Sequence, residues 1–346
     1  MAASFLVVGA TGNTGRSVVE TLSNHLKSSN TFSDYRILAM TRSANSSSAK
    51  ALAKFPHVEI VEYTWTEITS EWLREHNVAR AFIASHNEPP HFADESTFHI
   101  AALGAGVKYV VRISTTAANV APDCKAYYPR AHWAIEAMLD SPAFESMHWS
   151  SLQPNVFSQL YLGTAAELIK TVRNGGKQHT LRLMADADSP VGIIDPSEVG
   201  PFAAHLLLQV NTSAQNKRRY VLNGPEDITG SQIVAMVEKH IGAKVEDVSF
   251  KDVGFVDYMA AASSYSKNVI LTIKHAPETA WQGKAKAETT SKEVLEIAAP
   301  KKTPTRNGVS CGRLDAYFEE YKKQVVGEAE PYTPVPRRPQ TYRAET

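Results

Sequence analysis

A glycine-rich turn near the N-terminus constrains the fold of this chain more than any other feature. The apolar run of residues 5–8 is followed directly by Gly9, Gly12 and Gly15, and residues 16–22 then repeat apolar side chains at helical spacing. The first glycine permits a tight turn, the second lets a pyrophosphate approach the backbone, and the third lets the helix pack close to the strand. The start of such a helix also offers free N–H groups to a phosphate. The motif predicts a dinucleotide-binding Rossmann-type domain, and a glycine turn in an unrelated sheet is the alternative.

The first half of the chain alternates segments typical of strands and of helices. Further strands are expected at residues 35–40, 58–63, 80–84, 107–113 and 148–152, with helices at 96–104 and 131–139 among the segments between them. Strands that alternate with helices form a mostly parallel sheet covered by helices. We therefore expect an α/β fold with a doubly wound Rossmann-type sheet, and a smaller α+β lobe for the substrate after it.

The pattern changes after Pro154. One helix is expected over residues 157–172, and short strands and turns over 182–194. The next helix, to residue 210, would begin at Asp195, where an Asx cap precedes a proline. After a short strand at 220–222, Thr229 and Gln232 form a capping-box pattern for a helix that ends near residue 241.

These segments suggest two domains and a tail. The expected division is a dinucleotide-binding domain over 1–156, with residues near 191–210 packing back on it, a mixed substrate lobe over 157–326, and a flexible tail over 327–346. We interpret the lysine- and alanine-rich stretch 284–302 as a solvated insertion, and we expect a last helix at 313–326.

Charge and cysteine content narrow the class of partner. Lys and Arg together number 36, as do Asp and Glu, so no excess of positive charge favours nucleic acid or an anionic membrane surface. No apolar stretch is long enough to span a bilayer. The two cysteines, Cys124 and Cys311, are too few for a disulfide framework, which favours a cytoplasmic location. The twelve histidines show no metal-ligand spacing, so we expect no metal.

The end of the second expected strand indicates which nucleotide would bind. An acidic residue at that point favours NAD, whereas an arginine accommodates the 2′-phosphate of NADP. Arg42 follows Thr41 there, so we expect NADP(H), the alternative being a solvated surface arginine. Arg16 is a second candidate for the phosphate. The residues predicted to bind the cofactor are Gly9, Thr11, Gly12, Asn13, Thr14, Gly15, Arg42, Ser85 and Pro154.

Several segments together resemble the NmrA-like group of atypical short-chain dehydrogenases. The resemblance rests on the glycine motif and on residues 41–43, 105–111, 130–136, 152–157 and 191–200, and it covers about residues 4–240. It implies an NADP-binding Rossmann domain with a smaller C-terminal lobe. It does not imply a single function, because some members of the group reduce small molecules and others sense NADP(H) and regulate other proteins.

Short-chain dehydrogenases use a Tyr-x-x-x-Lys motif on a helix and a serine at the end of the preceding strand. The matching segment here has Tyr128, but His132 stands in the place of the lysine, and Ser114 suits the third position. A tyrosine of this kind exchanges a proton with the substrate carbonyl while hydride moves. Alternatively, Tyr128 and His132 only pack at the start of the helix. Tyr127 could replace Tyr128 if the register shifts by one, and Lys125 could replace the missing lysine.

We therefore predict an NADP(H)-dependent reductase that transfers hydride to a small carbonyl, enone, imine or quinone-like metabolite, in specialised metabolism. Tyr128, His132 and Ser114 are the expected catalytic residues, and Phe157 is expected to line the substrate pocket. One alternative is a non-catalytic NADP(H) sensor that binds a transcription factor or an enzyme. A weaker one is an isomerase or cyclase on the same fold. A small-molecule substrate is the expected partner, while a protein partner or a homodimer stays open.

Overall fold

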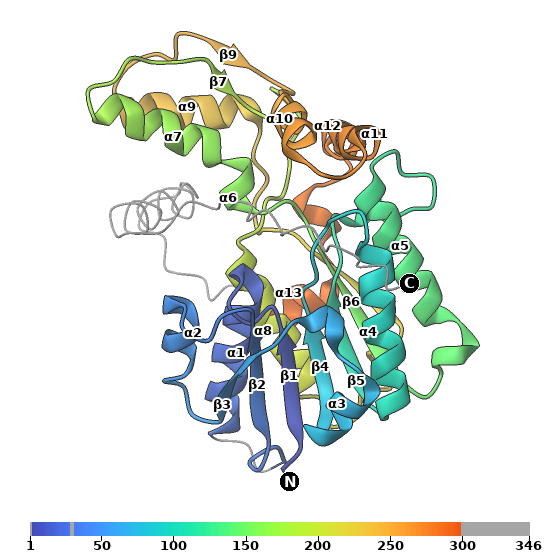
Figure 1. The fold of residues 1–346 in the computed structure, drawn as a ribbon. Helices are drawn as coiled ribbons and strands as arrows, with labels where there is room; N and C mark the ends of the chain where they lie inside the picture. The colour runs from blue at the N-terminus through green and yellow to red at the C-terminus, as the bar shows by residue number, and fades with distance from the viewer. Residues whose placement is uncertain (1, 28–30, 299–346) are drawn as a thin grey trace, which may run out of the picture. The chain divides into compact units, whose positions relative to one another are not determined.

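Seven parallel strands form the main sheet of the computed structural model, which describes residues 2–27 and 31–298 (Figure 1). Their order is β3-β2-β1-β4-β5-β6-β8. The strands are β1 (Ser4–Val8), β2 (Arg36–Thr41), β3 (Val58–Glu62), β4 (Val78–Ile83), β5 (Tyr109–Ile113), β6 (His148–Pro154) and β8 (Arg218–Leu222). The chain runs outward from β1 to β3, returns to β4 on the other side of β1, and then runs outward to β8. This confirms the expected doubly wound sheet and puts the topological switch point, where ligands of such sheets bind, between β1 and β4.

Helices cover both faces of the sheet. They are α1 (Asn13–Leu26), α2 (Ser47–Leu52), α3 (Ser70–Glu75), α4 (His91–Ala105), α5 (Tyr127–Asp140), α8 (Pro196–Leu207) and α13 (Lys292–Ala298). Side chains of β1 alternate between the faces, as a buried strand requires. Phe5 and Val7 belong to the core under α1 and α8, whereas Leu6 and Val8 belong to the core under α3, α4 and α5.

A smaller group of elements, here called the C-terminal lobe, lies at the carboxyl edge of the sheet (Figure 1). It consists of α6 (Ser158–Tyr161), α7 (Gly163–Arg173), β7 (Leu181–Arg182), α9 (Gly230–Ile241), β9 (Val248–Ser249), α10 (Phe255–Ala262), α11 (Lys267–Leu271) and α12 (Glu278–Trp281). β7 and β9 pair in parallel as a separate two-stranded sheet. Short 3₁₀ turns complete the described elements, at Trp65–Glu67, Ala117–Asn119, Pro142–Phe144, Thr272–His275 and Ala287–Thr289.

Two of the expected helix starts are confirmed by their caps. The Asp195 carboxylate accepts a hydrogen bond from the Ser197 amide at 2.7 Å, with Pro196 at the first helical position of α8. At α9, Thr229 and Gln232 form the reciprocal capping box. α8 then packs along α1, where Gly200 lets the two backbones approach, since a Cβ there would lie 2.0 Å from Ser17 Oγ.

Two expectations about local structure are wrong. Two helices replace the single helix expected over residues 157–172, and the chain turns between them at Leu162. The first helix begins only at Ser158, because Phe157 is extended and bridges to Ile194. The described part of the stretch 284–302, which ends at residue 298, is not a solvated insertion. Ala285 is buried, and the Ser291 amide donates to the Val221 carbonyl of β8 at 3.0 Å.

The expected helix at 313–326, the tail and Cys311 lie outside the described residues, so the domain boundaries stay predictions. Among the helices of the described ranges, none has the length and hydrophobicity needed to cross a membrane.

Candidate functional site

The glycine turn forms a close-packed cradle between β1 and α1. Gly9 has φ +77°, a conformation that favours glycine, and a Cβ on Gly15 would lie 2.1 Å from the Gly9 carbonyl oxygen. Gly12 caps α1 without any side-chain hydrogen bond, and the first turn holds no acidic residue. The first amides of α1 are therefore open to a phosphate, and the dipole of the helix favours a negative charge there.

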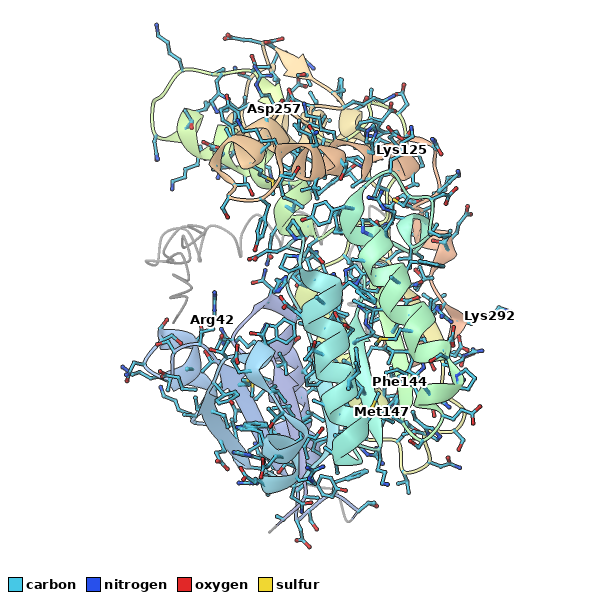
Figure 2. The ribbon with its side chains drawn as sticks, turned by 45° about the vertical axis from the view of Figure 1, so that its right-hand side comes forward. Arg42, Lys125, Phe144, Met147, Asp257 and Lys292 are labelled. Carbon is cyan, nitrogen blue, oxygen red and sulfur yellow. The ribbon has the colours of Figure 1, made fainter. Side chains whose placement is uncertain are left out.

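The end of β2 is tied to this cradle. The Ala10 amide donates to the Met40 carbonyl at 3.2 Å, and the hydroxyls of Thr11 and Thr41 lie 3.3 Å apart. Arg42 follows at once and is exposed, and Figure 2 shows its side chain extending beyond the end of β2. No described residue holds the Arg42 guanidinium by a hydrogen bond or ion pair. Arg16, the second candidate for the phosphate, is instead paired with Glu20 at 2.8 Å.

The other expected cofactor residues surround the same edge. Asn13 donates to the side chain of Gln159 at 3.2 Å, which joins the start of α1 to α6, and Thr14 is buried. Ser85 follows β4 but is turned inward, because its hydroxyl donates to Glu95 at 2.5 Å. Pro154 ends β6 and pairs with Leu222 of β8.

Tyr128 and Ser114 both lie near the carboxyl end of β5, where Tyr128 interacts with Thr115, the residue after Ser114. Tyr128 lies in the first turn of α5 and is half-buried, and burial raises the pKa of its phenol to about 12, although a hydrogen bond with the Thr115 side chain opposes this. The neighbouring Ser114 is 5% exposed, and its Oγ has no hydrogen-bond partner among the described residues. A buried hydroxyl without a partner is costly, so Ser114 Oγ has an unused capacity for a hydrogen bond.

His132 is held by groups other than Tyr128. Its Nδ1 lies 2.8 Å from Nη2 of Arg112, and its Nε2 lies 3.0 Å from Oδ1 of Asn87. A guanidinium can only donate, so Nδ1 of His132 accepts and Nε2 carries the proton. Burial and the charge of Arg112 lower the pKa of His132 well below its usual range. His132 is therefore a neutral imidazole that does not supply the positive charge of the lysine it replaces.

The two alternative residues for this motif, Lys125 and Tyr127, also interact with other groups. The Lys125 ammonium lies 3.3 Å from Glu278, beside the helices of the C-terminal lobe (Figure 2). The Tyr127 hydroxyl donates to the Asn87 carbonyl at 2.5 Å. No described lysine thus stands next to Tyr128 to lower the pKa of its phenol.

Arg112 is the centre of a buried ionic network that the sequence analysis missed. Its Nε lies 2.6 Å from Glu95, and neither side chain has exposed surface. His91 and His99 also hydrogen-bond Glu95, at 2.7 and 3.2 Å. Burial by itself would raise the pKa of Glu95, but Arg112 and the hydrogen bonds of the two histidines hold it well below its usual range. One signal was available in the sequence, since an arginine within an apolar strand must find a buried partner.

The same network contains the one group of possible metal ligands found among the described residues. Ligand atoms of His91, Glu95 and His132 lie within 4.8 Å of one another. The Arg112 guanidinium already contacts both Glu95 and His132, and it supplies the positive charge that a metal ion would bring. These residues therefore do not fit a metal site.

Comparison with known proteins identifies the family. The model of the NmrA-like family matches residues 1–292. The chain belongs to the NmrA-like family. No curated protein sequence matches this chain at a significant level.

Solved structures with the same fold include reductases, a nucleoside-diphosphate-sugar epimerase and a regulator. An NADPH-dependent quinone oxidoreductase of Escherichia coli, complexed with NADPH, is 19% identical, with a TM-score of 0.64 over 91% of this chain and 99% of its own. The triphenylmethane reductase of a Citrobacter species, complexed with NADP(H), is 18% identical, with a TM-score of 0.60 over 87% and 97%. The negative transcriptional regulator NmrA, in complex with NAD, is 14% identical, with a TM-score of 0.63 over 95% and 98%. At these identities the likeness establishes the fold, and the function of this family member must be argued from its own residues.

Phe157 lies at the junction between the sheet and α6. It is partly buried and packs against the core under α1 and α8. Its expected place in a substrate pocket stays a prediction.

Proposed function

We propose that this member of the NmrA-like family is an NADP(H)-dependent reductase of small carbonyl or quinone-like compounds. One observation carries the proposal. Tyr128 and the unpartnered Ser114 hydroxyl stand at the carboxyl end of β5, on the same sheet edge as the glycine cradle and Arg42. The quinone and triphenylmethane reductases of the same fold support an aromatic acceptor as the substrate class. As expected from the sequence, we propose that the enzyme is cytoplasmic and acts in specialised metabolism.

The residues present fit a phosphorylated dinucleotide. The uncapped start of α1 and the bare glycine backbone suit the pyrophosphate, and an exposed arginine at the end of β2 suits a 2′-phosphate. When bound, the nicotinamide would supply the hydride for a reduction.

Tyr128 would supply the proton. Because burial raises the pKa of its phenol to about 12, Tyr128 is protonated at neutral pH and can act as a general acid. Hydride from the bound cofactor would add to the carbonyl carbon, the electron pair of the broken π bond would move to the oxygen, and Tyr128 would protonate that oxygen to leave an alcohol. Water would then return a proton to Tyr128. With a quinone, enolisation of the first product would leave the hydroquinone. The Ser114 hydroxyl would donate a hydrogen bond to the same oxygen as its negative charge develops.

Nucleotide binding tests the first part of the proposal. Tryptophan fluorescence titrations with NADPH, NADP⁺, NADH and NAD⁺ should show that NADPH binds more tightly than NADH. Arg42→Ala should weaken NADPH by about tenfold or more, since a charge-assisted hydrogen bond contributes roughly 1.5–3 kcal/mol, and should leave NADH unchanged. Lys177→Ala, which removes an exposed cation after α7, is the control and should change neither. Equal loss for both nucleotides in Arg42→Ala would contradict the assignment to the 2′-phosphate.

Reduction of 1,4-naphthoquinone tests the second part. Tyr128→Phe removes the proton donor and keeps the ring, so turnover should fall by about 10² or more while the Kd for NADPH stays within twofold. Unchanged turnover in Tyr128→Phe would remove Tyr128 from the mechanism.

One observation favours a second candidate, a nucleotide-responsive regulator. His132 is neutral and bound elsewhere, so the charged lysine of the active short-chain motif has no substitute here. NmrA itself, a negative transcriptional regulator of the same fold, binds NAD. A wild-type protein that binds NADPH but reduces no quinone or carbonyl in a broad panel would support this candidate over the reductase.

A further inference from the structure

Asn87 has an unusual hydrogen-bonding state for an exposed residue. It follows β4, and both of its acceptor atoms are already used within the protein. The backbone carbonyl accepts from the Tyr127 hydroxyl at 2.5 Å, and the side-chain Oδ1 lies 3.0 Å from Nε2 of His132. No described residue accepts a hydrogen bond from Asn87 Nδ2. The side chain therefore presents donors alone to whatever lies beside it.

The orientation of this carboxamide is set from inside the protein. Arg112 can only donate, so it makes Nδ1 of His132 the acceptor and leaves the proton on Nε2. The atom of Asn87 that faces Nε2 must then be the oxygen, which directs Nδ2 away from His132. Glu95 holds Arg112 in turn, and both of these side chains are fully buried. A chain of three buried groups, Glu95, Arg112 and His132, thus determines which end of an exposed amide faces outward.

The outward Nδ2 lies next to the proposed site. His132 and Tyr128 are four residues apart on α5, so they lie on one face of that helix. Asn87 itself extends from the carboxyl end of β4, the strand between β1 and β5. Its free donors therefore stand between the glycine cradle of β1 and the Tyr128 and Ser114 hydroxyls at β5, where a dinucleotide and its substrate would meet.

We propose that Asn87 is a positioning residue that donates a hydrogen bond to an oxygen of the bound ligand, and that His132 and Arg112 orient it for this purpose. This inference rests on the proposed function for the location of the ligand. The oxygen belongs either to the cofactor, as a ribose hydroxyl or the carboxamide oxygen, or to the substrate carbonyl. His132 acts through Asn87 in this arrangement and does not touch the reacting atoms.

Binding measurements with four variants test the inference without relying on turnover. Asn87→Asp keeps the size and still accepts from His132, but replaces the donor with a second oxygen. His132→Asn can still accept from Arg112 but cannot reach Asn87, whereas the amide of His132→Gln is long enough to donate to Asn87. Asn174→Asp, at the end of α7, is the control for the added charge. For each protein, the Kd of NADP⁺ is measured first, and then the Kd of 1,4-naphthoquinone for the protein saturated with NADP⁺.

The two titrations distinguish the two sources of the oxygen. A loss of about tenfold or more in NADP⁺ affinity, in Asn87→Asp and His132→Asn but not in His132→Gln or Asn174→Asp, assigns the oxygen to the cofactor. Both variants lose the hydrogen bond from Asn87 and leave the ligand oxygen without its partner, and Asn87→Asp also sets a carboxylate against that oxygen. The same pattern confined to naphthoquinone assigns it to the substrate. If Asn87→Asp changes both constants no more than Asn174→Asp does, the inference is wrong.

A second measurement tests whether Arg112 sets the tautomer of His132. In ¹⁵N NMR spectra of the imidazoles, His132 should be the neutral tautomer with its proton on Nε2 in the wild-type protein, and a proton on Nδ1 would overturn the role given to Arg112. If the wild-type protein binds both ligands but does not reduce naphthoquinone, the proposed function fails while the comparison of Kd values still decides the role of Asn87.

Discussion

Nε of Arg112 lies 2.6 Å from Oε1 of Glu95, and neither side chain has any exposed surface. This pair joins β5 to α4, and through His132 it also reaches α5. Two charges are thus kept out of water in the middle of one face of the sheet. Both charges have further partners, since Glu136 lies 3.4 Å from Arg112 and two histidines hydrogen-bond Glu95, but removal of either charge leaves the other without its nearest counter-ion.

Removal of one member of this pair should be strongly destabilising. Arg112→Met leaves Glu95 buried without its cation, and we expect a loss of about 3–5 kcal/mol in the free energy of unfolding, measured by urea denaturation. Adding Glu95→Gln to Arg112→Met should recover part of the loss, because the unpaired charge is then gone. Arg16→Met, which breaks an exposed pair with Glu20, is the control and should cost at most about 0.5 kcal/mol. Equal losses for Arg112→Met and Arg16→Met would show that the buried pair of Arg112 and Glu95 stabilises the fold no more than the exposed pair does.

Stability should fall in mild acid. Burial lowers the pKa of both His99 and His132 in the folded protein from the ordinary value of 6.5. As the pH falls below 6.5, the unfolded chain takes up protons on these histidines at a higher pH than the folded protein does, so the unfolded state is favoured. The slope from each histidine should approach about 1.4 kcal/mol per pH unit well below pH 6.5 and should be about half of that at pH 6.5. Urea denaturation at pH 7.5, 6.5 and 5.5 measures the slope, and His132→Gln should reduce it by the share of one histidine. A free energy of unfolding that is constant over this range would contradict the prediction.

The packing of α1 on α8 depends on the absence of a side chain at Gly200. A Cβ there would lie 2.0 Å from Ser17 Oγ and 2.7 Å from the Val18 amide nitrogen, so Gly200→Ala must push the helices apart. We expect a loss of about 1–3 kcal/mol in thermal or urea denaturation. Gly163→Ala is the matched control, because a Cβ at the start of α7 meets nothing within 4 Å. That substitution should be neutral or stabilise by less than about 1 kcal/mol.

The rate of the proposed reduction should stay independent of the ionisation of Tyr128 up to high pH, because this phenol is an unusually weak acid. Because burial raises the pKa of Tyr128 to about 12, ionisation of this phenol should not reduce kcat below about pH 10. The pH profile of naphthoquinone reduction, taken up to the limit of protein stability, measures this. A fall in kcat with an apparent pKa between about 7 and 9 would mean that another group lowers the pKa of Tyr128 in the complex, or that a different acid donates the proton.

Features with a local cause could be predicted from the sequence. The glycine motif, the alternation of strands with helices, and the caps at Asp195 and Thr229 all act over a few residues, and each is present in the structure. The same local rules failed at Phe157, where a helical pattern of side chains gave way to a bridge with Ile194, 37 residues along the chain. They failed again after Lys284, where a polar composition concealed backbone pairing with β8.

The amino-acid sequence by itself determined the backbone of the cofactor site, because a strand, a glycine turn and a helix start need only one another. The tertiary structure alone decided how the side chains around Tyr128 are held. The lysine position of the motif could be read directly as His132, but its protonation state depends on Arg112 from β5, and its second partner is Asn87 from beyond β4. These groups are 20 and 45 residues from His132 along the chain, and their effect on one another begins only when the sheet brings them within hydrogen-bonding distance.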